Sequence, residues 1–256
     1  MTSGGGQLRA GLGEQARDGG GLTARPFVSA HYAQSLDGRI ALRGRCTRLS
    51  STEGIDLAHR ERAAHDAVLV GSGTVRIDDP RLTVRACHGP NPSPVVLASS
   101  LDLPDDARLF QGGTRVLVLG VRGRADPVRA ARLRAVGAEV RLVESGPDGL
   151  VSLPAALATL HDLGVSQLLV EGGARVLTSF LRAHLVDRVS IEITTKLLGN
   201  QGLAALGDLG IGDDMEVPEL QEVEVTRLVS GFVLTGRPQR RDAAPVSRRR
   251  FAGGNR

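Results

Sequence analysis

Glycines and arginines follow an uninterrupted apolar run in the first third of the chain. The run Ala67–Val70 leads into Gly71 and Gly73, and Arg81 and Arg85 come a few residues later. Four consecutive apolar residues are typical of a strand buried on both faces, and glycine lets backbone N–H groups approach an anion closely. Strand ends of this kind bind phosphates in open α/β sheets. We therefore expect a glycine turn here that holds a nucleotide or another phosphorylated ligand.

A second apolar run ends in Glu171, Gly172 and Gly173, which are followed by Ala174 and Arg175. Two glycines at the start of a helix leave its first N–H groups open to a phosphate, with the Glu171 carboxylate beside them. The alternative is structural: the glycines make a tight strand-to-helix turn and Glu171 caps the helix. The residues alone leave both readings open.

Two further polar positions follow apolar runs. They are the segment Tyr32–Arg39, with His31 just before it, and Ser99. The carboxyl ends of parallel strands meet at one edge of a sheet, where such sheets bind ligands. We therefore expect these two positions and the two glycine segments to converge on one site.

Strand and helix patterns alternate along most of the chain. Apolar runs predict strands at Phe27–Ala33, Ala67–Gly71, Val95–Ala98, Arg115–Leu119, Glu139–Val143, Gln167–Glu171, Arg188–Thr194 and Gly231–Thr235. Apolar residues at three- and four-residue spacing predict helices at Thr52–Ala64, Pro127–Val136, Leu153–Leu163 and Ala174–His184, with Ser51 or Thr52 capping the first. This order predicts an α/β fold with a mostly parallel central sheet flanked by helices.

The positive charge of the chain is concentrated near its end. The net charge is +4, but residues 237–256 carry seven arginines and one aspartate, so residues 1–236 sum to −2. The body is therefore not an obvious nucleic-acid binder, and with no Trp and one Tyr it is not expected to stack bases. We expect a flexible N-terminal tail at residues 1–25, one domain at residues 26–237 and a basic flexible tail at residues 238–256.

Several catalytic motifs are missing from the sequence. It contains no P-loop, no zinc-protease motif and no serine elbow, and Arg76 occupies the place of the third glycine of a Rossmann fingerprint. Cys46 and Cys87 fit no zinc motif, and the six histidines share no metal-ligand spacing, so we expect no metal and mostly surface histidines. No apolar segment has signal-peptide or membrane length, which predicts a cytoplasmic protein that does not bind membranes.

Three segments, in this order, resemble the pyrimidine reductase of riboflavin biosynthesis. They are Ser35–Arg39 (Ser-Leu-Asp-Gly-Arg), Gly71–Arg85 with its string Asp-Asp-Pro-Arg-Leu-Thr-Val-Arg, and Val170–Gly173 (Val-Glu-Gly-Gly). The resemblance covers about Pro26 to Gly236, and the string that ends at Arg85 is its most specific part. This family occurs alone or fused behind a deaminase domain. The 25 residues before Pro26 leave no room for a deaminase, so a stand-alone reductase is expected.

The resemblance implies a dihydrofolate-reductase-like fold, NADPH as cofactor, a phosphoribosylamino-pyrimidine as substrate and a homodimer. Hydride would pass from NADPH to C1′ of the ring-opened imine and give a ribitylamine. The implied cofactor-binding residues are Ala33, Gly71, Gly73, Thr74, Asp78, Ser99, Gly172, Gly173, Ala174 and Arg175. The implied substrate-binding residues are Cys46, Thr47, Arg62, Leu82, Arg85 and Glu171. The candidate catalytic residues are Glu171, Asp78 and His31.

Arginines are the expected phosphate ligands of this site. Arg62 and Arg85 can hold the 5′-phosphate of the substrate by forked hydrogen bonds. Arg76 or Arg124 could meet the 2′-phosphate of NADPH. Glu171 would hold ring N–H groups of the substrate and stabilise the iminium that accepts hydride.

This chain departs from the family at three places. His31 stands where fused bacterial members have Lys and archaeal members tend to have Asn. Cys46-Thr47-Arg48 replaces a Ser-x-Trp pattern, and Thr194-Thr195-Lys196 replaces Ala-Pro-Lys, with Lys196 the only lysine of the chain. These departures leave the exact pyrimidine open.

Two other functions remain open at this point. One is a reductase of the same fold that acts on a pterin, a folate or a secondary-metabolite imine. The other is a non-catalytic nucleotide-binding protein whose basic tail binds nucleic acid. The presence of both Arg62 and Arg85 favours a phosphorylated substrate, and Asp78 with Glu171 favours an enzyme.

Overall fold

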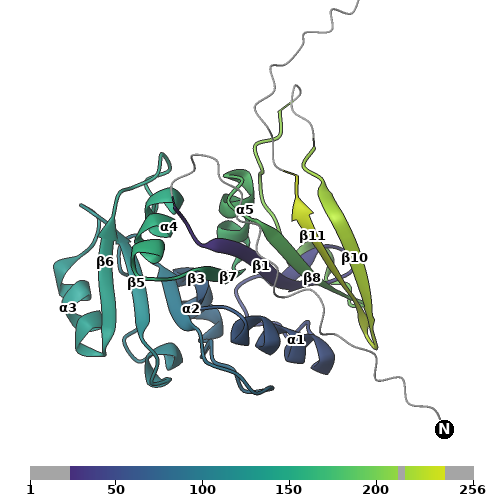
Figure 1. Ribbon diagram of the computed structural model, residues 1–256, viewed down its shortest axis with the longest axis horizontal. Coiled ribbons are helices and arrows are strands. Elements are labelled where there is room, and N and C mark those ends of the chain that lie inside the picture. The colour runs from purple at the N-terminus through teal and green to yellow at the C-terminus, as the bar shows by residue number, and fades with distance from the viewer. Residues whose placement is uncertain (1–23, 213–216, 240–256) are drawn as a thin grey trace, which may run out of the picture.

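The computed structural model describes residues 24–212 and 217–239, and in this part of the chain nine strands form one sheet (Figure 1). Their order across the sheet is β10-β11-β8-β1-β7-β3-β4-β5-β6. The strands are β1 (Phe27–Gln34), β3 (Ala67–Gly71), β4 (Ser93–Leu97), β5 (Val116–Val121), β6 (Ala138–Val143), β7 (Gln167–Gly172), β8 (Arg188–Thr194), β10 (Leu220–Leu228) and β11 (Gly231–Pro238). A separate pair joins β2 (Arg39–Leu42) to β9 (Gly202–Ala204).

The seven strands from β8 to β6 run parallel, and only the β10–β11 hairpin at one edge is antiparallel. This arrangement confirms the predicted mostly parallel sheet, and all eight predicted strands are present within a few residues of their expected ends. The short pair β2–β9 and the strand β10 were not predicted. The strand β10 has no uninterrupted apolar run, because Glu222 and Glu224 alternate with valines and Arg227 lies near its end.

Helices cover both faces of the sheet (Figure 1). The helices are α1 (Thr52–Ala63), α2 (Ser72–Asp78), α3 (Pro127–Ala135), α4 (Leu153–Asp162) and α5 (Ala174–Arg182), with short 3-10 turns at Arg108–Gln111 and Gly199–Gln201. Helices α4 and α5 lie on one face, and α1, α2 and α3 lie on the other (Figure 1). The four predicted helices are confirmed, with Ser51 as the cap of α1.

The predicted glycine turn after β3 is wrong. Residues Ser72–Asp78 form the helix α2, and Gly71 is its N-cap residue, with a φ of −85°. At seven residues this helix is too short to show an apolar period in the sequence, and the glycines at its start are typical of a turn. Gly71 serves packing, since a Cβ added to it would lie 2.9 Å from the Val176 side chain of α5.

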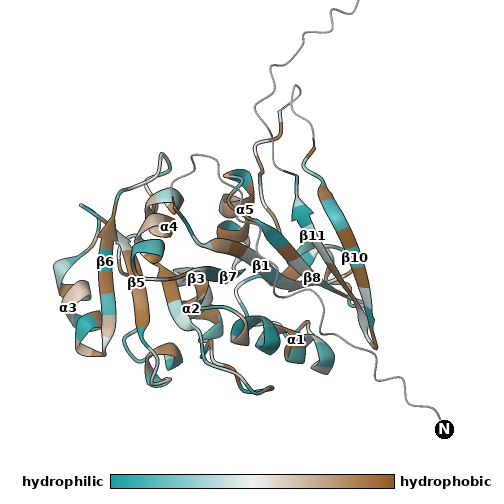
Figure 2. Ribbon diagram, in the orientation of Figure 1, coloured by the Kyte–Doolittle hydropathy of each residue, from teal (hydrophilic) through white to brown (hydrophobic). Residues whose placement is uncertain are grey.

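The two faces of the sheet differ in polarity around β1 and β8. Beneath α4 and α5 the strands present apolar side chains such as Val28, Ala30 and Val189. Beneath α1 the same two strands bury Ser29, His31, Ser190, Glu192 and Thr194. Helix α1 is itself largely hydrophilic (Figure 2).

Polar contacts therefore hold α1 against the sheet. The residues that α1 buries are Gly54, His59 and Glu61, and not the apolar side chains whose spacing predicted the helix. Hydrogen bonds and ion pairs depend on direction, so they set the position of α1 more narrowly than an apolar contact of similar area would. None of the helices in the described part of the chain is long and apolar enough to cross a membrane.

Candidate active site

A bulge at the end of β7 places Glu171. Along β3 and β7, Leu69 pairs with Val170 and Val70 pairs with Gly172, so Glu171 is the one residue without an opposite partner on β3. Bulges of this kind bend a strand and redirect a side chain, and they are common beside active sites. Glu171 lies two residues after Leu169, on the face of the sheet that α1, α2 and α3 cover, and its side chain contacts Arg62 of α1.

Glu171 forms a two-point ion pair with Arg62 of α1. The Nε and Nη2 atoms of Arg62 donate to the two carboxylate oxygens at 2.6 and 2.7 Å, and the side chains are only 14% and 12% exposed. Burial opposes the charge of both groups, but their mutual attraction prevails: it lowers the pKa of Glu171 and raises that of Arg62. Both groups are therefore charged at neutral pH.

This ion pair bears on the structural alternative for Glu171 and on the expected role of Arg62. Glu171 does not cap α5, which begins without a side-chain hydrogen bond to its first turn. The fork of Arg62 is directed at Glu171, and its Nη1 donates to the Thr83 carbonyl at 3.2 Å, so Arg62 does not offer an empty fork to a phosphate.

Arg85 lies in the same cluster with much of its guanidinium available. Its Nη1 donates to the Thr83 hydroxyl at 2.7 Å, whereas its Nε and Nη2 have no hydrogen-bond partner within the described residues. Burial and the nearby charges of Arg62, Arg81 and Arg108 lower the pKa of Arg85. A local excess of positive charge of this kind is suited to a phosphate dianion.

His59 on α1 fixes the backbone of Arg85. The backbone N–H of Arg85 donates to Nδ1 of His59 at 2.9 Å. Since Nδ1 accepts, His59 is neutral with its proton on Nε2. Burial, together with the charges of Arg62 and Arg85, lowers the pKa of His59. No sequence pattern indicates this role, because nothing in the sequence shows that α1 and residue 85 meet.

The expectation that most histidines lie at the surface is wrong for half of them. His31, His59 and His65 are 5%, 5% and 8% exposed. His31 lies on β1 one residue past the pairing of Ala30 with Val170, which places it beside Glu171 on the same face of the sheet. Its Nδ1 lies 3.1 Å from the Ser190 hydroxyl.

Asp78 and Cys46 form a second pair at the end of α2. Burial raises the pKa of Asp78, and a hydrogen bond from the Cys46 thiol opposes that shift. Burial and the Asp78 carboxylate raise the pKa of Cys46. The neighbouring Thr47 accepts from the backbone N–H of Leu42 at 2.9 Å, which anchors this segment to β2.

The start of α5 differs from that of most other helices. Ser51, Asp126 and Ser152 cap α1, α3 and α4, whereas α2 and α5 begin at Gly71 and Gly173 with no side-chain cap. The first N–H groups of α5 therefore remain available to an anion.

Glycine is needed at the start of α5 for its conformation. Gly172 and Gly173 have φ angles of +132° and +85°. Thr74 of α2 donates to the Gly172 carbonyl at 3.4 Å, which joins the two helix starts. Gly73 is different: it has no positive φ, and a Cβ there would meet nothing within 4 Å.

The other expected cofactor residues lie along the same edge. Ala33 is near the end of β1, and Ser99 follows β4, where its hydroxyl accepts from the backbone N–H of Val151 at 3.2 Å. Arg76 donates to the Asp102 carbonyl at 2.7 Å, and Arg124 donates to the Gly149 carbonyl. The fully buried Leu82 has a φ of +56°, which places it in the tight bend before Arg85.

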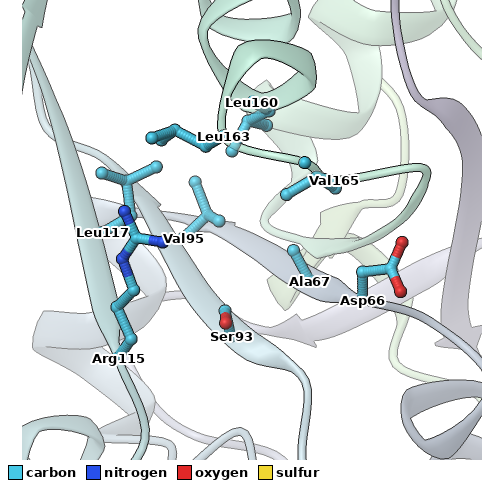
Figure 3. A pocket seen from close by; sticks show the side chains of 10 residues that line it. Asp66, Ala67, Ser93, Val95, Arg115, Leu117, Leu160, Leu163 and Val165 are labelled. Carbon is cyan, nitrogen blue, oxygen red and sulfur yellow. The ribbon is translucent and has the colours of Figure 1, made fainter.

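Two cavities help to locate the site. One of about 500 Å³ lies along α5 and is lined by Ala174, Arg175, Arg182 and Arg43. The other, of about 180 Å³, lies at the opposite, amino edge of β3, β4 and β5, below Leu160 of α4 (Figure 3). This second cavity contains none of the expected site residues, so the carboxyl edge is the candidate site.

The hydrogen bond at His59 predicts a pH dependence of stability. Below the ordinary value of about 6.5 the unfolded chain binds a proton at His59, whereas the folded protein, with its lowered pKa, resists protonation. The free energy of unfolding is therefore expected to fall as the pH drops below about 6.5. Urea unfolding of the wild-type protein and of His59→Gln from about pH 8 to about pH 5 measures this contribution. Equal slopes against pH in the two proteins would contradict it.

Comparison with known proteins shows which family this chain matches. The family model described as the RibD C-terminal domain matches residues 26–234. The 2,5-diamino-6-ribosylamino-4(3H)-pyrimidinone 5′-phosphate reductase of Methanothermobacter thermautotrophicus is 35% identical over 206 residues, which are 79% of this chain and 92% of the relative. The riboflavin biosynthesis protein RibD of Aquifex aeolicus is 34% identical over 212 residues, which are 82% of this chain but only 57% of that protein.

Solved structures agree with the fold. A deaminase and 5-amino-6-(5-phosphoribosylamino)uracil reductase from Thermotoga maritima superposes with a TM-score of 0.65 at 31% identity, and covers 84% of this chain and 57% of its own. Acinetobacter baumannii RibD superposes with a TM-score of 0.71 at 25% identity, again over 84% of this chain and 59% of its own. The chain is thus similar to the part of RibD that these comparisons share.

Proposed function

Because the chain belongs to the RibD C-terminal domain family, we propose that it reduces the ribosyl side chain of a phosphoribosylamino-pyrimidine to a ribityl side chain, with NADPH, in riboflavin biosynthesis. One observation carries the proposal. The buried pair Glu171–Arg62 and the cation cluster around Arg85 lie at the same sheet edge as the uncapped start of α5. A carboxylate, a phosphate site and a second anion site at one edge are what a phosphorylated substrate and a dinucleotide require.

The substrate is assigned to the side of α1. Arg85 binds its 5′-phosphate through Nε and Nη2, and the charges of Arg81 and Arg108 add to the attraction. Glu171 remains ionised and gives a fixed negative charge near C1′, which favours the positively charged iminium over the neutral imine. Arg62 holds Glu171 in place by two hydrogen bonds.

The cofactor is assigned to the start of α5. The first N–H groups of α5 and the adjoining cavity suit its pyrophosphate, and NADPH supplies the hydride when bound. His31 and Asp78 complete the site from β1 and α2. The main task of these residues is to orient the pyrimidine side chain and keep its environment polar but dry.

Gly173→Ala is expected to weaken NADPH binding about tenfold, because an alanine at φ +85° is strained and shifts the N–H groups of α5. Its Cβ would also lie 3.0 Å from the Thr74 hydroxyl. Quenching of NADPH fluorescence measures the affinity. Gly164→Ala is the matched control, since Gly164 has a φ of +86° with open space around it and lies at the opposite edge of the sheet. Equal affinities in the two variants would remove α5 from the cofactor site.

A preference for NADPH over NADH is part of the proposal. Arg76 and Arg124 both lie on segments near Ser99, although each already donates to a backbone carbonyl. We expect kcat/KM to be at least about tenfold higher with NADPH, the size of one charge-assisted hydrogen bond to a phosphate. Equal values with the two cofactors would remove this preference.

The decisive experiment is turnover of the two candidate phosphoribosylamino-pyrimidines, before and after deamination, with NADPH and followed by cofactor absorbance. Reduction of either one supports the proposal. Activity on neither, together with reduction of dihydrofolate, would replace it with a folate or pterin reductase. Binding of labelled DNA or RNA that depends on residues 238–256, without any reduction, would favour the nucleotide-binding alternative; residues 240–256 of this tail lie outside the described part of the chain.

We also propose that the protein is a homodimer joined through β10. This edge strand exposes Val223 and Val225, at 48% and 62%. When two copies of β10 pair antiparallel, the part of one strand that carries Glu224 faces the part of the other strand that carries Arg227. The pairing therefore places opposite charges near each other. Sedimentation equilibrium is expected to show a dimer that Val225→Lys dissociates. Val229→Lys, in the turn after β10, is the control that should leave the dimer intact.

A further inference from the structure

The only lysine of the chain binds the backbone of a distant segment. Lys196 follows β8, and its Nζ donates to the carbonyls of Arg48 and Leu49 at 2.9 and 2.8 Å. These two carbonyls belong to the segment that connects β2 to α1. A charged donor that holds two adjacent carbonyls restricts the path of that segment more than one neutral hydrogen bond does.

Glu192, in β8 itself, holds the end of that segment. The Oε1 atom of Glu192 accepts from the backbone N–H and the hydroxyl of Ser51, at 3.0 and 3.2 Å. Glu192 is 1% exposed, and its Oε2 is buried with no hydrogen-bond partner among the residues that the structure describes. A Cβ on Gly54 would overlap the Glu192 carboxyl group, so only glycine fits the first turn of α1 above it.

We infer that Lys196 and Glu192 form a clamp, the β8 clamp, that positions the substrate side of the active site. The inference rests on the proposed function. The residues just before the clamp are Cys46 and Thr47, and α1, which begins just after it, carries His59 and Arg62. Lys196 and Glu192 are therefore positioning residues, and they act through the segment between β2 and α1 that they hold.

The polar underside of α1 explains why this helix needs a clamp. Few apolar side chains of α1 are buried, and its far end is held by the ion pair of Glu61 with Arg188 of β8. The strand β8 therefore holds α1 near both ends. A shift along the helix axis would move Arg62 away from Glu171 and His59 away from the Arg85 backbone.

Cys46 offers a readout of the clamp that does not depend on activity. Cys46 is exposed, so thiol reagents reach it, and partial desolvation together with the Asp78 carboxylate raises its pKa, which slows its reaction. In a Cys87→Ser background, Cys46 is the only thiol. We expect Lys196→Met in this background to raise the rate at which Cys46 reacts with Ellman's reagent at least about threefold. The loosened segment would carry the Cys46 thiol away from the Asp78 carboxylate, whose charge raises the pKa of the thiol. Lys196→Arg should restore most of the parent rate, and Arg134→Met, at an exposed cation of α3, should leave it unchanged.

Activity of the same variants tests the positioning. Lys196→Met is expected to raise KM for the phosphorylated pyrimidine about tenfold while NADPH affinity and the melting temperature stay near those of the parent. Lys196→Gln serves as a second variant if Lys196→Met does not fold. An unchanged thiol rate, or a faster thiol rate with unchanged KM, overturns the inference. If the parent reduces neither pyrimidine, the proposed function fails, and the thiol rates alone still decide whether the clamp exists.

Discussion

Glu171→Gln is expected to lower kcat by about ten- to a hundredfold, the lower range for loss of an electrostatic contribution to a transition state. Glutamine keeps the shape of the side chain but removes the charge that favours the iminium. The same change leaves the buried Arg62 guanidinium without its counter-ion, at 14% exposure. We therefore also expect the free energy of unfolding to fall by about 3 kcal/mol, as for other broken buried ion pairs.

A double-mutant cycle separates the two effects of this substitution. Arg62→Gln alone should destabilise the protein similarly, since it leaves Glu171 as the unpaired charge. The combined Glu171→Gln and Arg62→Gln protein should regain part of the lost stability, because no buried charge is left unpaired. Its kcat should remain low. Recovery of kcat together with stability would show that Glu171 serves only the structure.

Arg85→Ala is expected to raise KM for the phosphorylated pyrimidine by about ten- to a hundredfold, the range of a charge-assisted hydrogen bond worth 1.5–3 kcal/mol. The phosphate is bound equally in the ground state and the transition state, so kcat should change little. NADPH affinity should be unchanged, because Arg85 lies on the α1 side of the site, where its side chain donates to Thr83. Steady-state kinetics and NADPH titration measure these quantities.

The dephosphorylated substrate provides the control for this prediction. Wild-type protein and Arg85→Ala should show similar KM values for it, since the interaction at issue requires the phosphate. Arg134→Ala, at an exposed position of α3, should behave as wild type with both substrates. A fall in NADPH affinity in Arg85→Ala would mean that substrate and cofactor occupy the opposite sides.

Local patterns in the sequence were sufficient to predict eight of the nine strands of the sheet and four of the five helices seen in the described residues. Uninterrupted apolar runs such as Val68–Val70 and Val116–Leu119 can be buried only in a covered parallel sheet. Caps such as Ser51 act within one turn of their own helix and can be recognised without knowledge of the fold. Candidate residues at strand ends were predictable for the same reason, since parallel topology alone brings those ends to one edge.

The roles of individual side chains were decided by the tertiary structure. Strand alternation puts Glu171 on the face of the sheet that α1 covers, but only the packing of α1 on that face brings Arg62 to it. The partner of Arg62 and the acceptor for the Arg85 backbone lie 109 and 26 residues away along the chain. Side-chain hydrogen bonds have a short range and strict geometry. The sequence by itself therefore determined which residues reach the carboxyl edge of the sheet, and only the packing of α1 on β7 and β8 decided which of them meet.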